Sequence, residues 1–147
     1  MSEEADRLFA HHYVAANTLA DEGRLQDADT EFRAALRLRP DHAVTSFLRG
    51  NVLYRLERSI DALKAYQRAL DLEPGFTPAL GSIMAMQRTL CMLEPAEAAE
   101  RRLIQLIRSG ATPWISPTDA FAIAGLTAAE LLAINRAYAS RSLCARR

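Results

Sequence analysis

The chain has 147 residues, of which half are hydrophobic and 24% are charged, a composition typical of a folded domain and not of a disordered segment. Eighteen basic side chains balance eighteen acidic ones, so the chain lacks the basic excess that nucleic-acid binding requires. We therefore expect no nucleic acid among its partners.

The N-terminal residues 1–6 are acidic where a signal peptide would be basic, and no apolar run reaches the ~18 residues of a membrane span. These features predict a cytoplasmic protein without membrane contact. Cys91 and Cys144 belong to no CxxC pair and no Cys/His cluster, so the sequence predicts no disulfide framework and no zinc site.

The chain repeats itself, because residues 9–42 align with residues 43–76 at a constant offset. Each segment contains two stretches with apolar residues at helical spacing, which predicts a helical hairpin. The coinciding pairs include Asn17 with Asn51, Ala28 with Ala62, Phe32 with Tyr66, Ala35 with Ala69, Leu36 with Leu70, and Pro40 with Pro74.

The repeated positions suit the close packing of two helices. Small residues are expected at the points of closest approach, and the aromatic rings of Phe32 and Tyr66 are expected to fill the space between the helices. Pro40 and Pro74 should end the second helices. Gly23 is expected to form the turn of the first hairpin, where the second hairpin has Glu57. The small residues are Ala16, Ala28, Ala35, Gly50, Ala62 and Ala69.

A third, less regular hairpin is expected over residues 77–110. Residues 78–92 form its first predicted helix, and Pro95 stands in the first turn of a second helix that runs to about Arg108. Glu100 occupies the position of Phe32 and Tyr66, and no proline closes the unit. A terminal repeat that caps an array departs from the consensus in this way.

The C-terminal segment, residues 111–147, has its own helix signals. Gly110 can end one helix and Ser116 can begin another. Thr127 and Glu130 have the spacing of a capping box, flanked by Leu126 and Leu131 as a hydrophobic staple. The apolar face of the following helix is expected to cover the last repeat, and consists of Leu131, Ile134, Ala137 and Tyr138.

A 34-residue hairpin with this pattern resembles the tetratricopeptide repeat. The resemblance rests on Gly23, Ala28, Phe32, Ala35-Leu36 and Pro40, and on Gly50-Asn51, Tyr54, Ala62, Tyr66, Ala69-Leu70 and Pro74. It implies an all-α helical-hairpin solenoid of about three repeats (residues 1–110) with a C-terminal capping segment (residues 111–147). The first helices depart from the pattern, because His12 and Ser46 occupy the usual tryptophan position and Arg49 a usual leucine position.

Residues 107–139 also resemble the linker between repeats and catalytic domain in bacterial SPINDLY-like O-linked glycosyltransferases. The shared pattern includes Ile107-Arg-Ser-Gly110, Ser116-Pro117 and Gly125-Leu-Thr127. No catalytic residue of that family has a counterpart here. The resemblance implies a detached or truncated substrate-docking repeat region.

In tetratricopeptide arrays the first helix of each hairpin lines the concave surface, so the resemblance implies a partner-binding groove. Asn17 and Asn51, one repeat apart, are hypothesised to bind the backbone of an extended peptide, or alternatively to bond only a neighbouring helix. The groove residues by register are Tyr13, Asn17, Ala20 and Asp21, then Phe47, Asn51, Tyr54 and Arg55, then Gly81, Ala85, Arg88 and Thr89.

The aromatic groove residues Tyr13, Phe47 and Tyr54 could anchor apolar partner side chains or belong to the core, and both readings remain open. Tyr13 and Phe47 stand where a carboxylate-binding groove would have lysine, which argues against a carboxylate clamp.

No catalytic motif is present, since HExxH, GxGxxG, the phosphate loop and GxSxG are all missing from the sequence. The adjacent His11 and His12 point to different sides of a helix. We therefore predict a non-enzymatic module without metal or cofactor, which binds a peptide or helix of another protein. A small three-repeat secretion chaperone is an alternative, and self-association is left open because an array exposes its end faces.

Overall fold

The computed structural model describes residues 3–110, 120 and 123–144, and this part of the chain contains helices and no strand. It divides into two compact units, residues 1–74 and 75–147, and each is described by itself. The helices are α1 (Glu3–Asp21), α2 (Leu25–Leu38), α3 (Ala43–Arg55), α4 (Ser59–Leu72), α5 (Thr77–Thr89), α6 (Leu93–Arg108) and α8 (Ala128–Cys144).

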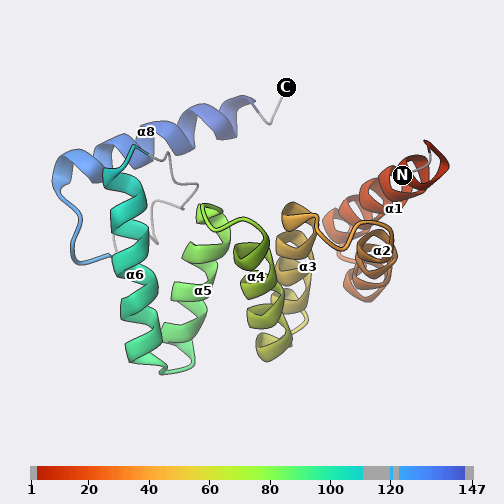
Figure 1. Cartoon of the computed structure of the whole chain (residues 1–147), viewed down its shortest axis with the longest axis horizontal. Coiled ribbons are helices and arrows are strands. Elements are labelled where there is room, and N and C mark those ends of the chain that lie inside the picture. Colours follow the sequence, from red (N-terminus) through yellow and green to blue (C-terminus); the bar gives the residue numbers. More distant parts are fainter. Residues whose placement is uncertain (1–2, 111–119, 121–122, 145–147) are drawn as a thin grey trace. The chain divides into compact units, whose positions relative to one another are not determined.

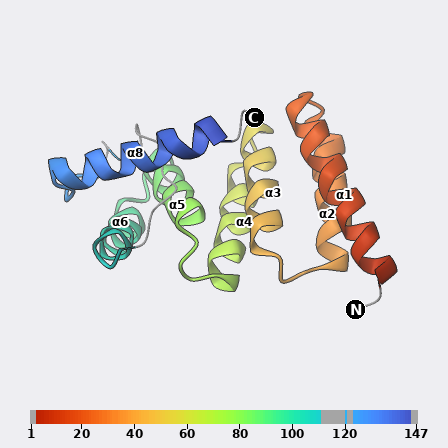
Figure 2. The same cartoon turned by 90° about the horizontal axis from the view of Figure 1, so that it is seen from above.

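The helices pair into hairpins as the repeat predicts. In the first unit α1 packs on α2 and α3 packs on α4, while α2 also contacts α3 and so joins the two hairpins (Figures 1 and 2). In the second unit α5 packs on α6. Helix α1 begins at Glu3, six residues before the repeat starts at Phe9, because the acidic first turn Glu3, Glu4 and Asp6 complements the positive end of the helix dipole.

All three hairpins turn through one residue with positive φ. Gly23 has φ of 79°, Glu57 of 59° and Cys91 of 57°. The amide of the following residue bonds a carbonyl of the last helical turn each time: Arg24 N to Leu19 O, Arg58 N to Leu53 O and Met92 N to Gln87 O. The third hairpin therefore repeats the turn of the first two, although its sequence is the least regular.

The predicted close approaches are confirmed. Phe32 and Tyr66 are buried, and the six small residues beside them are buried as well. At Gly50 a Cβ atom would lie only 2.5 Å from Cε1 of Tyr66, so no larger residue fits there without movement of the ring. Helices α2 and α4 end two residues before Pro40 and Pro74.

In the second unit, Glu100 replaces the aromatic residue of the other hairpins and makes polar contacts instead. Its carboxylate accepts from Arg88 of α5 through Oε2 and from the backbone amide of Ala124 through Oε1, the latter at 2.8 Å. The side chain thus links α5 and α6 to the segment before α8. Gly125 lies close to Ile104 of α6, since a Cβ atom there would be 2.7 Å from Ile104 Cδ1.

The capping box predicted at the start of α8 is confirmed. The Thr127 amide donates to Glu130 Oε2 at 2.7 Å, and the Glu130 amide donates to Thr127 Oγ1 at 3.3 Å. Arg108 of α6 donates to Glu130 Oε1 at 3.1 Å and to Gly125 O at 3.0 Å, which anchors the helix start to α6. Of the predicted apolar face, Ile134 is buried and the other three residues are half-buried.

Gly110 has φ of 90° directly after α6, as expected for a residue that ends a helix. The helix start predicted at Ser116 lies outside the described residues.

Candidate functional site

The first unit contains a cleft of about 180 Å³ between α1 and α3. Five of the groove residues predicted from the repeat register line it, together with three apolar residues that the register did not assign to the groove. The lining residues are Asn17, Ala20 and Asp21 from α1, Phe32 from α2, and Leu48, Asn51, Val52 and Arg55 from α3.

Helical spacing explains why these side chains share one surface. On α1, Asn17 lies three and four residues before Ala20 and Asp21. On α3, Leu48, Asn51 and Val52, and then Arg55, follow the same i, i+3, i+4, i+7 pattern. Residues at these intervals occupy one face of a helix.

Asn51 is held by the second helix of its own hairpin. The hydroxyl of Tyr66 in α4 donates to Asn51 Oδ1 at 2.9 Å. In the described part of the chain, the amide nitrogen Nδ2 of Asn51 donates to no protein group. Tyr66 thus holds the carbonyl end of this cleft-lining side chain, and the donor end has no protein partner in the described part of the chain.

Asn17 is held differently, because the residue opposite it in the first hairpin is Phe32, which has no hydroxyl. Its Nδ2 donates to the Tyr13 carbonyl of its own helix at 2.8 Å. Within the described residues its Oδ1 accepts no hydrogen bond. The two asparagines that line the cleft therefore have one acceptor and one donor without a protein partner in the described part of the chain.

Arg55 connects the two hairpins at one end of the cleft. Its Nη1 donates to the carbonyl of Ala20 at 2.8 Å, in the last turn of α1, and this carbonyl also accepts from the Gly23 amide at 3.2 Å. The positive charge of Arg55 is also favourable beside the negative end of the α1 dipole. Asp21, exposed at the end of α1, supplies the one carboxylate that lines the cleft.

The predicted groove residues Tyr13, Phe47 and Tyr54 do not line this cleft. Tyr13 stacks on Phe9, with ring centroids 5.8 Å apart. Phe47 packs on Tyr66 at 5.6 Å. Both are half-buried, whereas the Tyr54 side chain on α3 is exposed.

Arg88 belongs to the second unit, where it forms an ion pair with Glu100 of α6. The aligned positions Gly81 and Ala85 carry no polar side chain, so the asparagine pattern stops after the second hairpin.

Sequence reasoning placed Phe32 in the core and did not assign Leu48 or Val52 to the groove. Leu48 lies three residues before Asn51, and Val52 directly follows Asn51. Both positions are therefore close to Asn51 on the surface of α3, and this helical spacing is the signal that could have identified them. Phe32 has only 1% of its surface exposed, yet it borders the cleft. The cleft therefore combines a polar lining with an apolar one.

His42 caps α3 next to Tyr13. Its Nδ1 accepts from the backbone amide of Thr45 at 3.2 Å, and its ring packs edge-on to Phe9 and Tyr13. Burial among these rings, with a contribution from the positive charge of Arg39, lowers the pKa of His42 below its ordinary value. The neutral imidazole is the form that caps the helix.

No group of three or more His, Cys, Asp or Glu side chains is positioned to hold a metal ion among the residues that the structure describes. Nor does any helix in the same part of the chain combine the length and apolar character needed to span a membrane.

Comparison with known proteins identifies the repeats. Residues 12–42 and residues 43–76 each match a family model of the tetratricopeptide repeat. Protein O-mannosyl-transferase TMTC3 of Homo sapiens, and likewise of Mus musculus, is 37% identical over 54 residues, which are 37% of this chain. The chain matches only 6% of the length of these curated relatives.

Solved structures show the same fold at low identity. The first TPR of Spaghetti (RPAP3), bound to the HSP90 peptide SRMEEVD, is similar with a TM-score of 0.64 and 16% identity, over 94% of each chain. The TPR2B domain of yeast Sti1 in a pHsp70 complex has a TM-score of 0.65 and 13% identity, over 92% of this chain and 98% of that one. The architecture is thus that of tetratricopeptide-type helical hairpins.

Proposed function

We propose that this chain is a non-enzymatic protein-interaction module, acting as a cytoplasmic adaptor, that binds an extended peptide segment of a partner protein in the cleft between α1 and α3. The observation that carries the proposal is the pair Asn17 and Asn51, which stand one repeat apart and line one cleft. Their unused groups are complementary, because Asn17 keeps a carbonyl oxygen and Asn51 keeps an N–H donor.

A peptide backbone matches this pair chemically. Each peptide unit offers one donor and one acceptor, and an extended chain has them unpaired. Asn17 Oδ1 can accept from a backbone N–H of the bound segment, and Asn51 Nδ2 can donate to a backbone carbonyl. Such contacts do not depend on the partner's side chains, so they supply affinity without sequence preference.

The remaining lining residues supply selectivity. Leu48 is half-buried and offers an apolar contact to one side chain of the bound segment, with the buried Phe32 and Val52 behind it. Arg55 and Asp21 lie together at one end of the cleft, and each favours a partner group of charge opposite to its own. The exposed Tyr54 on α3 is the aromatic residue that we assign to partner contact, and we assign Tyr13 and Phe47 to internal packing. Arg88 lies in the second unit and is not assigned to this cleft.

Relatives of the same fold support the assignment of a peptide ligand. The similar structure of Spaghetti is bound to an HSP90 peptide, and that of Sti1 is a pHsp70 complex. The sequence argument against a carboxylate clamp still applies to this chain, since Tyr13 and Phe47 replace its lysines.

A peptide-library selection tests the proposal. The protein is immobilised, a random peptide library is selected on it, and the recovered peptide is titrated into the wild type and into Asn17→Ala by calorimetry. Asn17 bonds only its own helix, so its replacement should leave the fold intact while weakening peptide binding by about tenfold, as expected for one lost hydrogen bond at a desolvated contact.

Thr18→Ala is the matched control. Thr18 is the next residue, makes the same type of bond to a carbonyl four residues earlier, and does not line the cleft. Equal weakening by Thr18→Ala, or unchanged affinity of Asn17→Ala, would contradict the assignment of the cleft.

A second candidate function is a substrate-docking repeat region that works beside a glycosyltransferase. The observations that favour it are the match to an O-mannosyl-transferase and the resemblance of residues 107–139 to a glycosyltransferase linker, part of which lies outside the described residues. Copurification with a glycosyltransferase from the native lysate, lost on Asn17→Ala, supports this candidate. Copurification with unrelated proteins alone argues against it.

A further inference from the structure

The first unit has a second pocket, of about 230 Å³, lined by residues of α2, α3, α4 and the turn before α4. Arg49 of α3 contributes to it, two residues before Asn51 of the cleft. Two residues correspond to about 200° around a helix, so the pocket and the cleft open on opposite sides of α3. The two sites can therefore be altered independently.

The pocket is strongly basic. Four of its lining side chains are cationic and one is acidic, whereas the whole chain is neutral. The cations are Arg49, Arg58, Lys64 and Arg68, and the acid is Asp61.

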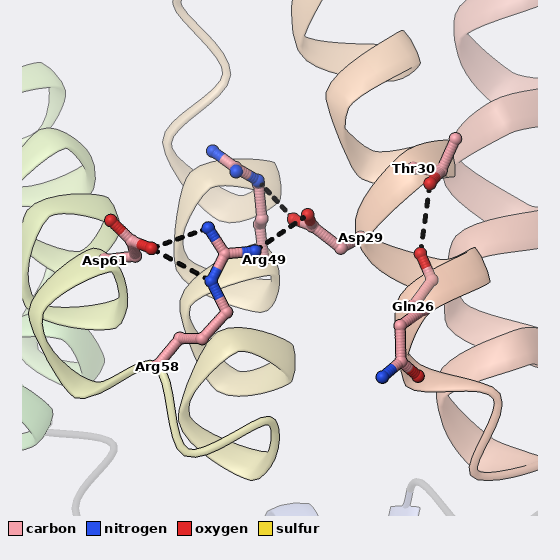
Figure 3. Close-up of polar contacts among 6 residues, drawn as sticks. All are labelled: Gln26, Asp29, Thr30, Arg49, Arg58 and Asp61. Carbon is pink, nitrogen blue, oxygen red and sulfur yellow. Dashed lines mark hydrogen bonds and ion pairs between the residues drawn. The ribbon is translucent and has the colours of Figure 1, made fainter.

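Two carboxylates hold two of these cations in place (Figure 3). Arg49 Nε donates to Asp29 Oδ1 at 2.6 Å, and the side chain of Asp29 is only 9% exposed. Arg58 donates to Asp61 Oδ2 through Nη2 at 2.6 Å and through Nε at 2.9 Å, and its Nη1 lies 3.8 Å from Asp29. Each carboxylate thus fixes a guanidinium group and neutralises one positive charge.

Lys64 and Arg68 leave two positive charges in excess. Both are exposed and lie one turn apart on α4, so they share one face of the helix. Arg68 makes a long bond of 3.4 Å to the Pro40 carbonyl, and neither residue forms an ion pair within the described part of the chain. Asp61, the one acid that lines the pocket, already accepts from Nε and Nη2 of Arg58.

We propose that this pocket binds the phosphoryl group of a phosphoserine or phosphothreonine side chain on a partner protein. A phosphoryl group carries a charge of about −1.5 to −2 at neutral pH, which matches the two excess charges, whereas a carboxylate carries one. Its oxygens accept from several donors at once, and positioned guanidinium groups recognise them in a fixed geometry. Leu36, which also lines the pocket and is half-buried, can contact the chain next to the phosphoryl group.

An NMR titration at low salt tests the proposal, with the peptide Ala-Ala-phosphoserine-Ala-Ala as probe and the Arg49, Arg58, Lys64 and Arg68 signals as readout. These signals are expected to shift in the wild type. In Lys64→Gln/Arg68→Gln the affinity should fall on the order of tenfold, since two exposed ionic contacts are lost while both glutamines favour helix. Arg7→Gln/Arg101→Gln removes the same charge from exposed positions outside the pocket and should bind like the wild type.

Three outcomes would overturn the proposal. Equal binding of the same peptide with glutamate in place of phosphoserine would show a general carboxylate surface. Inorganic phosphate that binds as tightly as the phosphopeptide would show a site for the free anion. Equal affinity of the wild type and Lys64→Gln/Arg68→Gln, or no shift at the four signals, would exclude the pocket. Asn17→Ala should bind the phosphopeptide normally, which separates this result from that of the cleft.

Discussion

The Tyr66 hydroxyl donates to Asn51 Oδ1 across the α3–α4 hairpin at 2.9 Å, and this bond has no counterpart in the first hairpin, where Phe32 replaces tyrosine. The difference of one oxygen atom explains why two aligned asparagines present opposite groups. Asn51 has its carbonyl oxygen occupied, whereas Asn17 turns its amide nitrogen to its own helix. The two hairpins thus share their helical arrangement, but the aligned asparagines form different hydrogen bonds.

Tyr66→Phe tests this relationship. The substitution removes the hydroxyl and keeps the ring that packs against Gly50 and Phe47, so we expect a loss of about 1 kcal/mol in the free energy of unfolding, measured with urea. Selected-peptide binding should weaken as well, because Asn51 is no longer oriented. Unchanged stability and binding would contradict an orienting role for Tyr66.

Gly50→Ala should destabilise the first unit by about 1–3 kcal/mol, because its Cβ atom would lie 2.5 Å from the buried Tyr66 ring. Gly75→Ala is the control, since a Cβ atom there meets nothing within 4 Å. Thermal and urea unfolding of both variants check the difference. Equal stability of the two variants would show that the helices do not approach as closely as described.

Glu57→Gly should stabilise the protein by about 0.5–1 kcal/mol. Glu57 adopts φ of 59°, which disfavours a residue with a Cβ atom, and glycine has no such penalty. The converse change Gly23→Ala, at φ of 79°, should destabilise by about 1 kcal/mol. Urea unfolding gives both values, and a loss of stability in Glu57→Gly would overturn this reading of the turn.

Asp29→Ala should cost about 1–3 kcal/mol, because it leaves the half-buried Arg49 without its carboxylate partner between the two hairpins. Asp27→Ala serves as the comparison, since the exposed Asp27–Arg24 pair should contribute less than about 1 kcal/mol. The double change Asp29→Leu/Arg49→Leu should recover most of the lost stability. If Asp29→Ala reduced the free energy of unfolding no more than Asp27→Ala does, the ion pair between Asp29 and Arg49 would not contribute to stability beyond an exposed pair.

The lowered pKa of His42 predicts a pH dependence of stability. Because the folded state holds this imidazole neutral, the unfolded state binds more protons between the lowered pKa and about 6.5, the ordinary value. The contribution of His42 to the free energy of unfolding is therefore fully present above about pH 6.5, and it is lost as the pH falls through the lowered pKa of the folded state. His42→Asn keeps a capping acceptor without titration and should reduce the slope of stability between pH 7 and pH 5.

His11→Asn provides the matched comparison for that experiment, because His11 is exposed on α1. The wild-type slope should persist in His11→Asn. A slope that is unchanged in His42→Asn would assign the pH dependence to other groups.

The local features of the fold were predictable from sequence because neighbouring residues determine them. Gly23 and Glu57 mark the turns by their repeat position, and Thr127 with Glu130 forms the capping box that its spacing predicts. The burial of Phe32 and Tyr66 follows from their helical spacing between small residues.

The polar contacts between helices were not predictable, because they depend on how helices are rotated and aligned against each other. The sequence pattern shows that Arg49 replaces a usual leucine, but not that Asp29 of α2 lies opposite it. It shows Tyr66 aligned with Phe32, but not that the hydroxyl reaches Asn51. The same dependence on helix rotation decides which predicted groove residues line the cleft and which do not. Those that line it are Asn17, Ala20, Asp21, Asn51 and Arg55.

The most direct test of the central claim is an NMR titration of the uniformly labelled protein with its selected peptide, which reports where the peptide binds. The cleft account predicts that the side-chain amide signals of Asn17 and Asn51 shift together with Arg55, while Lys64 and Arg68 of the basic pocket stay unchanged. Shifts confined to other surfaces, with Asn17 and Asn51 unaffected at saturation, would contradict it.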